Sequence, residues 1–251
     1  MTDKIKIKIS SFVANILEND ALRFGFTKKD KSNKNALLNK LIPTLVEVRK
    51  TKRNEIENIL KNEYNRTDSE NVYNAVNTVI DKVYFNDAEL NVLEEYIWIR
   101  PTKENSSIFD EIETSETILT AQDISVYIRG LLNEYSRFPQ YKREMLVFDK
   151  ELDVFSESCY TRQIIHFRNK ETNKRYRAFA FNYYYGYLYD QTNYCVIYDI
   201  NESKIKSIPL HFIQNIYMIK QKYTPNEKII DLLQEYTDNC NFDKEIYAGE
   251  N

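Results

Sequence analysis

The chain contains few glycines, prolines and cysteines, the residues that favour turns or form disulfide bridges. Its 251 residues include only four glycines and five prolines, which disfavours a turn-rich all-β architecture along the whole chain. The three cysteines, Cys159, Cys195 and Cys240, are odd in number and far apart, without a CxxC pair. The sequence therefore predicts neither a zinc site nor a disulfide framework.

Long apolar runs and catalytic motifs are also missing. No stretch approaches the roughly 18 apolar residues of a membrane helix, and no signal peptide opens the chain, so we expect a cytoplasmic protein without a membrane partner. No glycine-rich phosphate loop, GxSxG or HExxH is present. His166 and His211 lie on expected strands or at their ends, where a structural role is expected. We therefore expect no enzymatic activity, no cofactor and no bound metal.

Charge is unevenly distributed along an otherwise ordinary globular composition. Residues 1–53 hold 13 Lys and Arg against five acids, a net charge of +8, and the remainder carries −11. A basic segment on an acidic body favours an anionic polymer as partner. The alternative is a long basic helix whose charges pair with acids elsewhere in the fold.

The segment "DKIKIKISS", residues 3–11, alternates lysine with isoleucine. In an extended strand Lys4, Lys6 and Lys8 share one face, and the isoleucines share the other. Three ammonium groups on one face repel each other unless an anion lies against them. The alternative is a solvated edge strand protected by lysine.

Helices are expected after this strand. Ser10 or Ser11 is placed to cap a helix that ends near Gly25, and "TKKDKSNK" (27–34) is expected to be a loop. A second helix carries Leu37, Leu38, Leu41, Ile42, Leu45 and Val48 at helical spacing. Pro43 is expected to interrupt or kink it, and helical patterns resume over 54–64 and 69–84.

A similar order recurs further on. "EYIWIRP" (95–101) predicts a strand, 105–119 a helix capped by Asn105 or Ser106, and 120–138 a helix with Thr120 and Asp123 as a capping box. A shift of 90 residues places Ile7 on Ile97 and Leu38 on Ile128 without a gap between strand and second helix. This agreement indicates an internal repeat.

The order strand, helix, helix resembles the ribbon-helix-helix fold of Arc- and MetJ-type repressors, in which two strands pair into an antiparallel ribbon that enters the major groove. The resemblance implies groove-facing roles for Lys4, Lys6 and Lys8. The second copy instead presents Tyr96, Trp98 and Arg100, which suit stacking on unpaired bases. Trp98 packed beneath the helices is the alternative. The two strands pair within one chain or between two chains, and we expect a homodimer.

From about Thr161 the pattern changes to short strands rich in β-branched and aromatic residues, which predicts a small barrel. Residues 161–222 resemble the WYL domain, a compact Sm-like or SH3-like barrel of bacterial regulators. Asn193, Tyr194 and Cys195 stand where that family has Trp-Tyr-Leu, so only the tyrosine is retained. Phe212 replaces a basic residue of the family, and Lys206 stands where it usually has an arginine.

The WYL resemblance implies a face that binds an anionic ligand, often nucleic acid. Its candidate residues are Arg162, Arg168, Arg175, Arg177, Tyr194, Lys204 and Lys206. The alternative is that these charges only keep one barrel face in water. A final helix is expected in "TPNEKIIDLLQEY", with Thr224 and Glu227 as a capping box around Pro225.

Together these patterns predict an α+β chain: a helical ribbon-helix-helix-like region (1–145, with repeats at 1–48 and 95–138), a WYL-like barrel (150–222), and a C-terminal helix and tail (223–251). The function expected first is a DNA-binding transcriptional regulator that senses a ligand through the barrel. The chain also resembles the WYL accessory proteins of type VI-D CRISPR systems, which bind single-stranded RNA and stimulate an effector nuclease. A third class, a structural dimerisation module, predicts no polynucleotide affinity.

Overall fold

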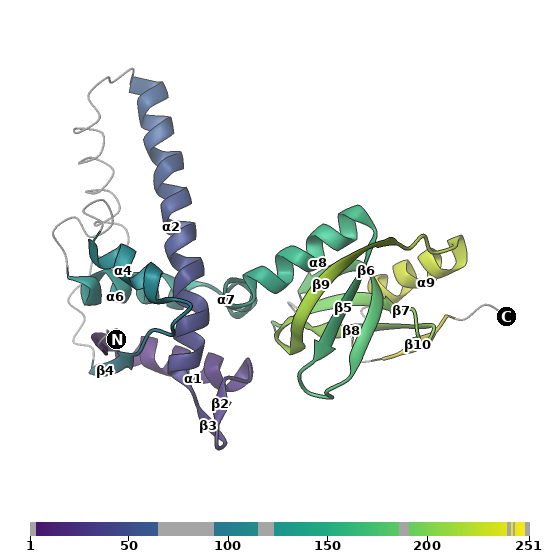
Figure 1. The fold of residues 1–251 in the computed structure, drawn as a ribbon, viewed down its shortest axis with the longest axis horizontal. Coiled ribbons are helices and arrows are strands. Elements are labelled where there is room, and N and C mark those ends of the chain that lie inside the picture. The colour runs from purple at the N-terminus through teal and green to yellow at the C-terminus, as the bar shows by residue number, and fades with distance from the viewer. Residues whose placement is uncertain are drawn as a thin grey trace. The chain divides into compact units, whose positions relative to one another are not determined.

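The computed structural model describes residues 4–64, 93–114, 123–185, 191–239, 242 and 244–248. The chain divides into two compact units, Met1–Phe138 and Pro139–Asn251, and each is described by itself (Figure 1). A helical first half and a strand-rich second half agree with the α+β class expected. The helix expected over 69–84 lies outside the described residues.

The N-terminal unit contains the order strand, helix, helix twice. Its elements are β1 (Ile5–Ser10), α1 (Ser11–Arg23), β2 (Thr27–Lys28), β3 (Lys31–Ser32), α2 (Lys34–Tyr64), β4 (Glu94–Ile99), α4 (Ser106–Thr114) and α6 (Ile124–Arg137). Strands β1 and β4 pair antiparallel into a two-stranded ribbon, with Ile7 directly opposite Ile97. The two strands of the repeat therefore pair within one chain.

The ribbon has one buried face and one exposed face. Ile7, Ile9, Ile97 and Ile99 are buried on the inner face, as strand alternation predicts. Helices α1, α2 and α6 pack against one another beside the ribbon, and their buried positions include Leu38, Leu41, Ile128 and Leu131. The apolar stripes found in the sequence thus form the core of this unit.

Three local expectations in this unit need correction. Pro43 does not interrupt its helix, since α2 runs unbroken over 31 residues and its neighbours Ile42 and Leu45 are buried. "TKKDKSNK" is not an open loop but the hairpin β2–β3, with left-handed Lys29 and Asp30 between its strands. The N-cap of α6 is Asp123, whose carboxylate accepts from the Ser125 amide, and Thr120 lies outside the described residues.

The C-terminal unit begins with α7 (Gln140–Val147) and α8 (Asp149–Thr161). The strands that follow are β5 (Gln163–Asn169), β6 (Arg175–Tyr185), β7 (Asn193–Asp199), β8 (Lys204–Pro209), β9 (Ile213–Lys222) and β10 (Ile246–Tyr247), with the short 3₁₀ helix η1 (Leu210–Phe212) before β9 and α9 (Glu227–Asp238) before β10. They form one antiparallel sheet in the order β10-β8-β7-β6-β5-β9.

The expected Sm-like or SH3-like barrel is not closed. In the described part of the chain β10 and β9 are the two edges of the sheet and do not pair with each other. Helix α9 contributes Ile229, Leu233 and Tyr236 to a core with residues of β6, β7 and β8. The sheet therefore buries one side against a helix instead of closing on itself.

The C-terminal helix starts later than expected. Asn226, not Thr224, is the N-cap of α9, and its side chain accepts from the Ile229 amide at 2.9 Å. Beyond α9, a short C-terminal strap (residues 242 and 244–248) returns to the sheet: the Ala248 amide donates to the Ser203 carbonyl, and the Tyr236 hydroxyl donates to the Lys244 carbonyl at 2.8 Å. The strap thereby adds β10 beside β8.

Candidate nucleic-acid interface

Part of the basic charge of residues 1–53 is neutralised inside the N-terminal unit. Lys34 pairs with Glu18 at 2.7 Å, Lys50 pairs with Glu111 on α4 at 2.6 Å, and Lys52 pairs with Glu134 on α6 at 2.7 Å. The basic helix α2 therefore does pair with acids elsewhere in the fold. On β1, Lys8 is also paired with an acid, Glu94, whereas Lys6 lies against aromatic rings.

The exposed side of the ribbon, here called the ribbon face, consists of Lys4, Lys6, Lys8, Tyr96, Trp98 and Arg100. Lys6 lies opposite Trp98 in the register, and Lys8 lies opposite Tyr96. The two rings are 55% and 52% exposed, although large aromatic side chains are usually buried. Trp98 therefore does not pack beneath the helices, because the inner face is occupied by isoleucine.

One cation of the ribbon face, Lys6, lies against its rings. The Lys6 ammonium is 3.9 Å from the centroid of the Tyr96 ring and 5.5 Å from that of Trp98, within cation–π range. Lys8 forms an ion pair with Glu94, and the hydrogen bond to that carboxylate raises the pKa of Lys8. A strand of bases laid here would meet both stacking surfaces and positive charge.

Arg100 follows β4 and is held through its backbone. Its amide donates to the Asn35 side chain at 2.8 Å, and its carbonyl accepts from Asn39 at 3.0 Å. Both partners belong to α2, so this helix fixes the end of β4. The Arg100 side chain is exposed at the same end of the ribbon face.

The structure separates the seven residues expected to form a ligand face in the C-terminal unit. Arg168 and Arg175 lie opposite each other on β5 and β6, and neighbouring Arg177 donates to Gln221 at 3.0 Å. Arg162 lies elsewhere, in a left-handed conformation that ends α8. The other three residues, Tyr194, Lys204 and Lys206, contact the C-terminal strap.

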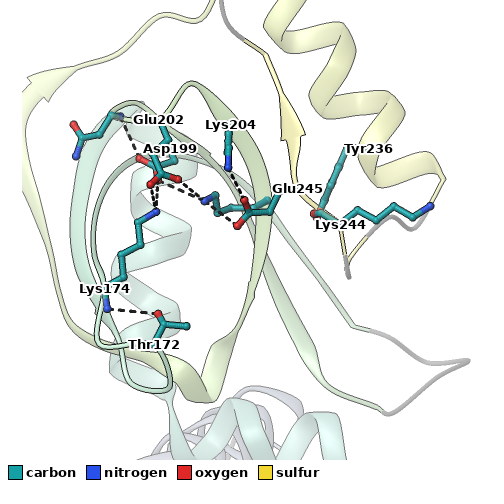
Figure 2. A network of polar contacts seen from close by, with 10 residues as sticks. Thr172, Lys174, Asp199, Glu202, Lys204, Tyr236, Lys244 and Glu245 are labelled. Carbon is teal, nitrogen blue, oxygen red and sulfur yellow. Dashed lines mark hydrogen bonds and ion pairs between the residues drawn. The ribbon is translucent and has the colours of Figure 1, made fainter.

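Asp199, Glu202 and Glu245 belong to one ion-pair network (Figure 2). Lys206 pairs with all three carboxylates. It is 2% exposed, and its ammonium lies 3.1 Å from both Glu202 and Glu245 and 3.7 Å from the buried Asp199. Lys204 also pairs with Glu245, at 3.0 Å. The strap thus places its own carboxylate on both lysines, and these lysines do not form an open anion site.

The strap also covers Tyr194. Phe242 stacks on the Tyr194 ring at 5.0 Å with nearly parallel planes. Tyr194 is therefore half-buried by an aromatic ring of the same chain. The alternation of residues along β7 and β8 indicated that Tyr194, Lys204 and Lys206 would be exposed. No local pattern in the sequence showed that the C-terminal strap would lie over them.

The ion-pair network is expected to make the free energy of unfolding of the C-terminal unit vary with pH in the acidic range. Burial lowers the pKa of Lys206, but hydrogen bonds to Glu202 and Glu245 outweigh it and leave that pKa raised. Hydrogen bonds from Lys174 and Lys206 lower the pKa of Glu202 to about 2, and hydrogen bonds from Lys204 and Lys206 lower that of Glu245.

We therefore expect acid to weaken the C-terminal unit. A carboxylate whose pKa is lower in the folded state contributes stability above its unfolded value of about 4.5 and loses it as the pH falls towards about 2. Urea unfolding between these values should give a shallower pH dependence for Glu202→Gln than for the wild type. Glu157→Gln on the exposed side of α8 should retain the wild-type slope. Equal slopes for all three proteins would contradict the assignment.

Two further features bear on chemistry. Among the described residues, no group of three His, Cys, Asp or Glu is placed to hold a metal ion. Burial raises the pKa of the Cys159 thiol to about 12 and also raises the pKa of the Cys195 thiol, which favours the protonated thiol at both positions. No helix in the described part is both long and apolar enough to cross a membrane.

Three residues beside Arg168 and Arg175 were not predicted as site residues from the sequence. His166, Asn215 and Tyr217 line the same pocket on β5 and β9. Side chains alternate along β5, so His166 lies on the same face as Arg168. This spacing was the one sequence signal that could have identified His166. The contribution of β9 depends on strand pairing and was not visible in the sequence.

Comparison with known proteins supports the fold. No protein-family model matches the chain, and no curated protein matches its sequence. Its structure is similar to the crystal structure of a CRISPR Cas-related protein, with a TM-score of 0.69 and 12% sequence identity. The match covers 96% of this chain and 72% of the other. At this identity the likeness establishes a shared fold.

Proposed function

We propose that this chain is a nucleic-acid-binding regulatory protein and that the ribbon face is its contact surface. The observation that carries the proposal is the pairing of exposed Tyr96 and Trp98 with Lys6 and Lys8 across one antiparallel ribbon. Exposed aromatic rings flanked by cations bind bases by stacking and phosphates by charge. A binding role, without catalysis, accounts for the residues on this surface.

Single strands fit this surface better than duplex. Stacking on an aromatic ring contributes about 1–3 kcal/mol per base and needs bases that are not already stacked in a helix. A duplex offers its base edges instead, which are read by hydrogen bonds. Because Tyr96 and Trp98 occupy the middle of the ribbon face, we favour single-stranded RNA over duplex DNA.

The fold is shared with a CRISPR Cas-related protein. Together with the ribbon-helix-helix and WYL resemblances, it supports an accessory role in which RNA binding by this chain stimulates a CRISPR effector nuclease. A second candidate is a transcriptional regulator whose lysine-bearing ribbon enters the major groove, as β-ribbon repressors do. The intramolecular pairing of β1 with β4 favours either role without a second copy, so the ribbon gives no reason to require a homodimer.

The ribbon face can be tested with the intrinsic fluorescence of Trp98, which is the only tryptophan in the chain. Single-stranded RNA should quench this fluorescence because its bases stack on the indole. In anisotropy titrations, Trp98→Ala should weaken single-strand binding by roughly 5- to 150-fold, the equivalent of one stacked base. Duplex DNA should bind more weakly and lose less affinity on this substitution.

The lysines are tested by a salt series. Lys4, Lys6 and Lys8 replaced together by glutamine should reduce the salt slope by about 2, at about 0.7 for each single-strand phosphate contact. The matched control replaces the exposed hairpin lysines Lys28, Lys29 and Lys31 by glutamine and should leave the slope near wild type. Tight duplex binding that is lost in the ribbon variant would favour the repressor. If neither polymer binds, the chain is instead a module that docks another protein.

A further inference from the structure

The C-terminal unit has a pocket of about 360 Å³ on the surface of β5, β6 and β9. Arg168 and Arg175 lie on it directly opposite each other, and both are exposed. Like charges on facing strand positions destabilise a sheet. Within the described residues, no carboxylate pairs with either guanidinium, so the pocket presents two cations suited to an anion.

A β-bulge forms one side of the pocket. Along the pairing of β5 with β9, His166 lies opposite Tyr217 and Arg168 lies opposite Gln214, so β9 contains one additional residue between them. Asn215 in this bulge has φ 52° and lines the pocket. A left-handed asparagine costs backbone free energy, and bulges of this kind re-aim side chains beside binding sites.

An aromatic platform lies next to the arginines. The rings of His166 and Tyr217 are stacked, with centroids 5.4 Å apart and an interplanar angle of 26°. Tyr217 is 54% exposed, so its ring is available to a ligand. The Nε2 atom of His166 is buried without a hydrogen-bond partner among the described residues, which is costly unless a ligand or water meets it.

We propose that this pocket binds one nucleotide, with its phosphate between Arg168 and Arg175 and its base against Tyr217. Two guanidinium groups bind a phosphate through charge-assisted, bidentate hydrogen bonds. A volume of 360 Å³ suits a single nucleotide, not a longer strand. The inference deepens the proposed function, on which it rests for the class of ligand, but it uses different residues in the other unit.

The pocket shares Tyr176 with the Lys206 network, since the Lys206 ammonium lies 5.3 Å from the centroid of that ring, but the lysines beside the C-terminal strap are already paired. There Glu245 already pairs with Lys204 and Lys206, and Phe242 stacks on Tyr194. Of the arginines and lysines first assigned to one ligand face, Arg168 and Arg175 line this open pocket. The ligand therefore binds beside the bulge in β9.

Calorimetric titration of the full chain with ribonucleoside 5′-monophosphates tests this pocket. Binding should be at least about tenfold tighter for a monophosphate than for the nucleoside or inorganic phosphate alone, because both halves of the pocket contribute. Arg168→Ala and Arg175→Ala should each weaken it by about tenfold or more, and Arg168→Lys should lose much of that affinity despite retaining the charge. Tyr217→Ala should weaken the monophosphate but not inorganic phosphate.

Lys220→Ala is the matched control, because it removes an exposed cation of β9 that does not line the pocket and should leave the affinity unchanged. The ligand is either the 5′ end of a strand or a free nucleotide, and short single strands with a 5′-phosphate or a 5′-hydroxyl distinguish the two. Tighter binding of the phosphorylated strand assigns the pocket to strand ends. Equal binding of both strands, with monophosphate affinity retained, assigns it to free nucleotides.

Failure of this inference is distinguishable from failure of the proposed function. No monophosphate binding at about 1 mM, or equal binding by wild type and the Arg168→Ala/Arg175→Ala double variant, overturns the pocket. The ribbon titrations with Trp98→Ala are unaffected by that outcome. Thermal unfolding without ligand verifies that each pocket variant is folded, so that lost binding reports on the pocket.

Discussion

Replacing Lys206 with methionine is expected to lower the free energy of unfolding by about 3–5 kcal/mol, the usual effect of removing one partner of a buried ion pair. The Lys206 and Asp199 side chains are 3% and 1% exposed. Without the ammonium, the buried Asp199 carboxylate keeps one cation, Lys174, whose Nζ lies 3.6 Å away, and the backbone amide of Asn201, which donates to its Oδ1 at 3.1 Å. Glu202 and Glu245 lose a partner at the same time, which also loosens the C-terminal strap.

Urea unfolding of the wild type, Lys206→Met and Lys204→Met measures this effect. Lys204 makes a more exposed pair with Glu245, so its loss should cost less than about 1 kcal/mol. Adding Asp199→Asn to Lys206→Met should recover part of the stability, because the stranded charge is removed with its partner. A cost for Lys206→Met no larger than that for Lys204→Met would show that the network is not a buried one.

Replacing Glu144 with alanine is expected to cost a similar amount, about 3–5 kcal/mol. This carboxylate is 1% exposed on α7 and links that helix to β7 and η1. It accepts from the backbone amide and side chain of Asn193 at 2.7 and 2.8 Å, and its other oxygen lies 2.6 Å from Nδ1 of His211. Its removal takes away the acceptor of the buried Asn193 amide, while the Asn193 side chain keeps the Tyr141 carbonyl at 2.8 Å.

The conservative variant separates lost packing from lost hydrogen bonds. Glu144→Gln keeps one acceptor oxygen and should retain part of the stability, whereas Glu157→Ala, on the exposed side of α8, should change it by less than about 0.5 kcal/mol. Chemical denaturation and hydrogen exchange of the Asn193 and His211 amides provide the measurements. If Glu144→Ala resembled Glu157→Ala, the site would be solvated in solution.

Local periodicity determined much of this protein from the sequence alone. The alternation of Lys4, Lys6 and Lys8 with isoleucine predicted a strand with one buried face, and the helical stripes predicted the core of the N-terminal unit. Ser10 or Ser11 was predicted to cap α1, and the cap is Ser10, whose hydroxyl accepts from the Val13 amide at 3.2 Å. These features depend on neighbours within a few residues, so a single sequence contains them.

Competition between neighbouring signals accounts for the local errors. Thr224 and Asn226 both suit an N-cap, and the structure uses Asn226, which Pro225 precedes. Pro43 removes one backbone donor, but burial of α2 on both sides of it, at Leu41, Ile42, Leu45 and Val46, outweighs that loss. Local preference sets these alternatives, and packing chooses between them.

The tertiary structure alone decided which charged residues share a surface. Whether β1 meets β4 of the same chain depends on a pairing across more than 80 residues of sequence, which no local pattern encodes. Lys206 lay at an apparently exposed strand position, yet a distant segment brought Glu245 over it. Arg168, Arg175 and Tyr217 meet only through the register and bulge of three strands, because strand pairing is non-local.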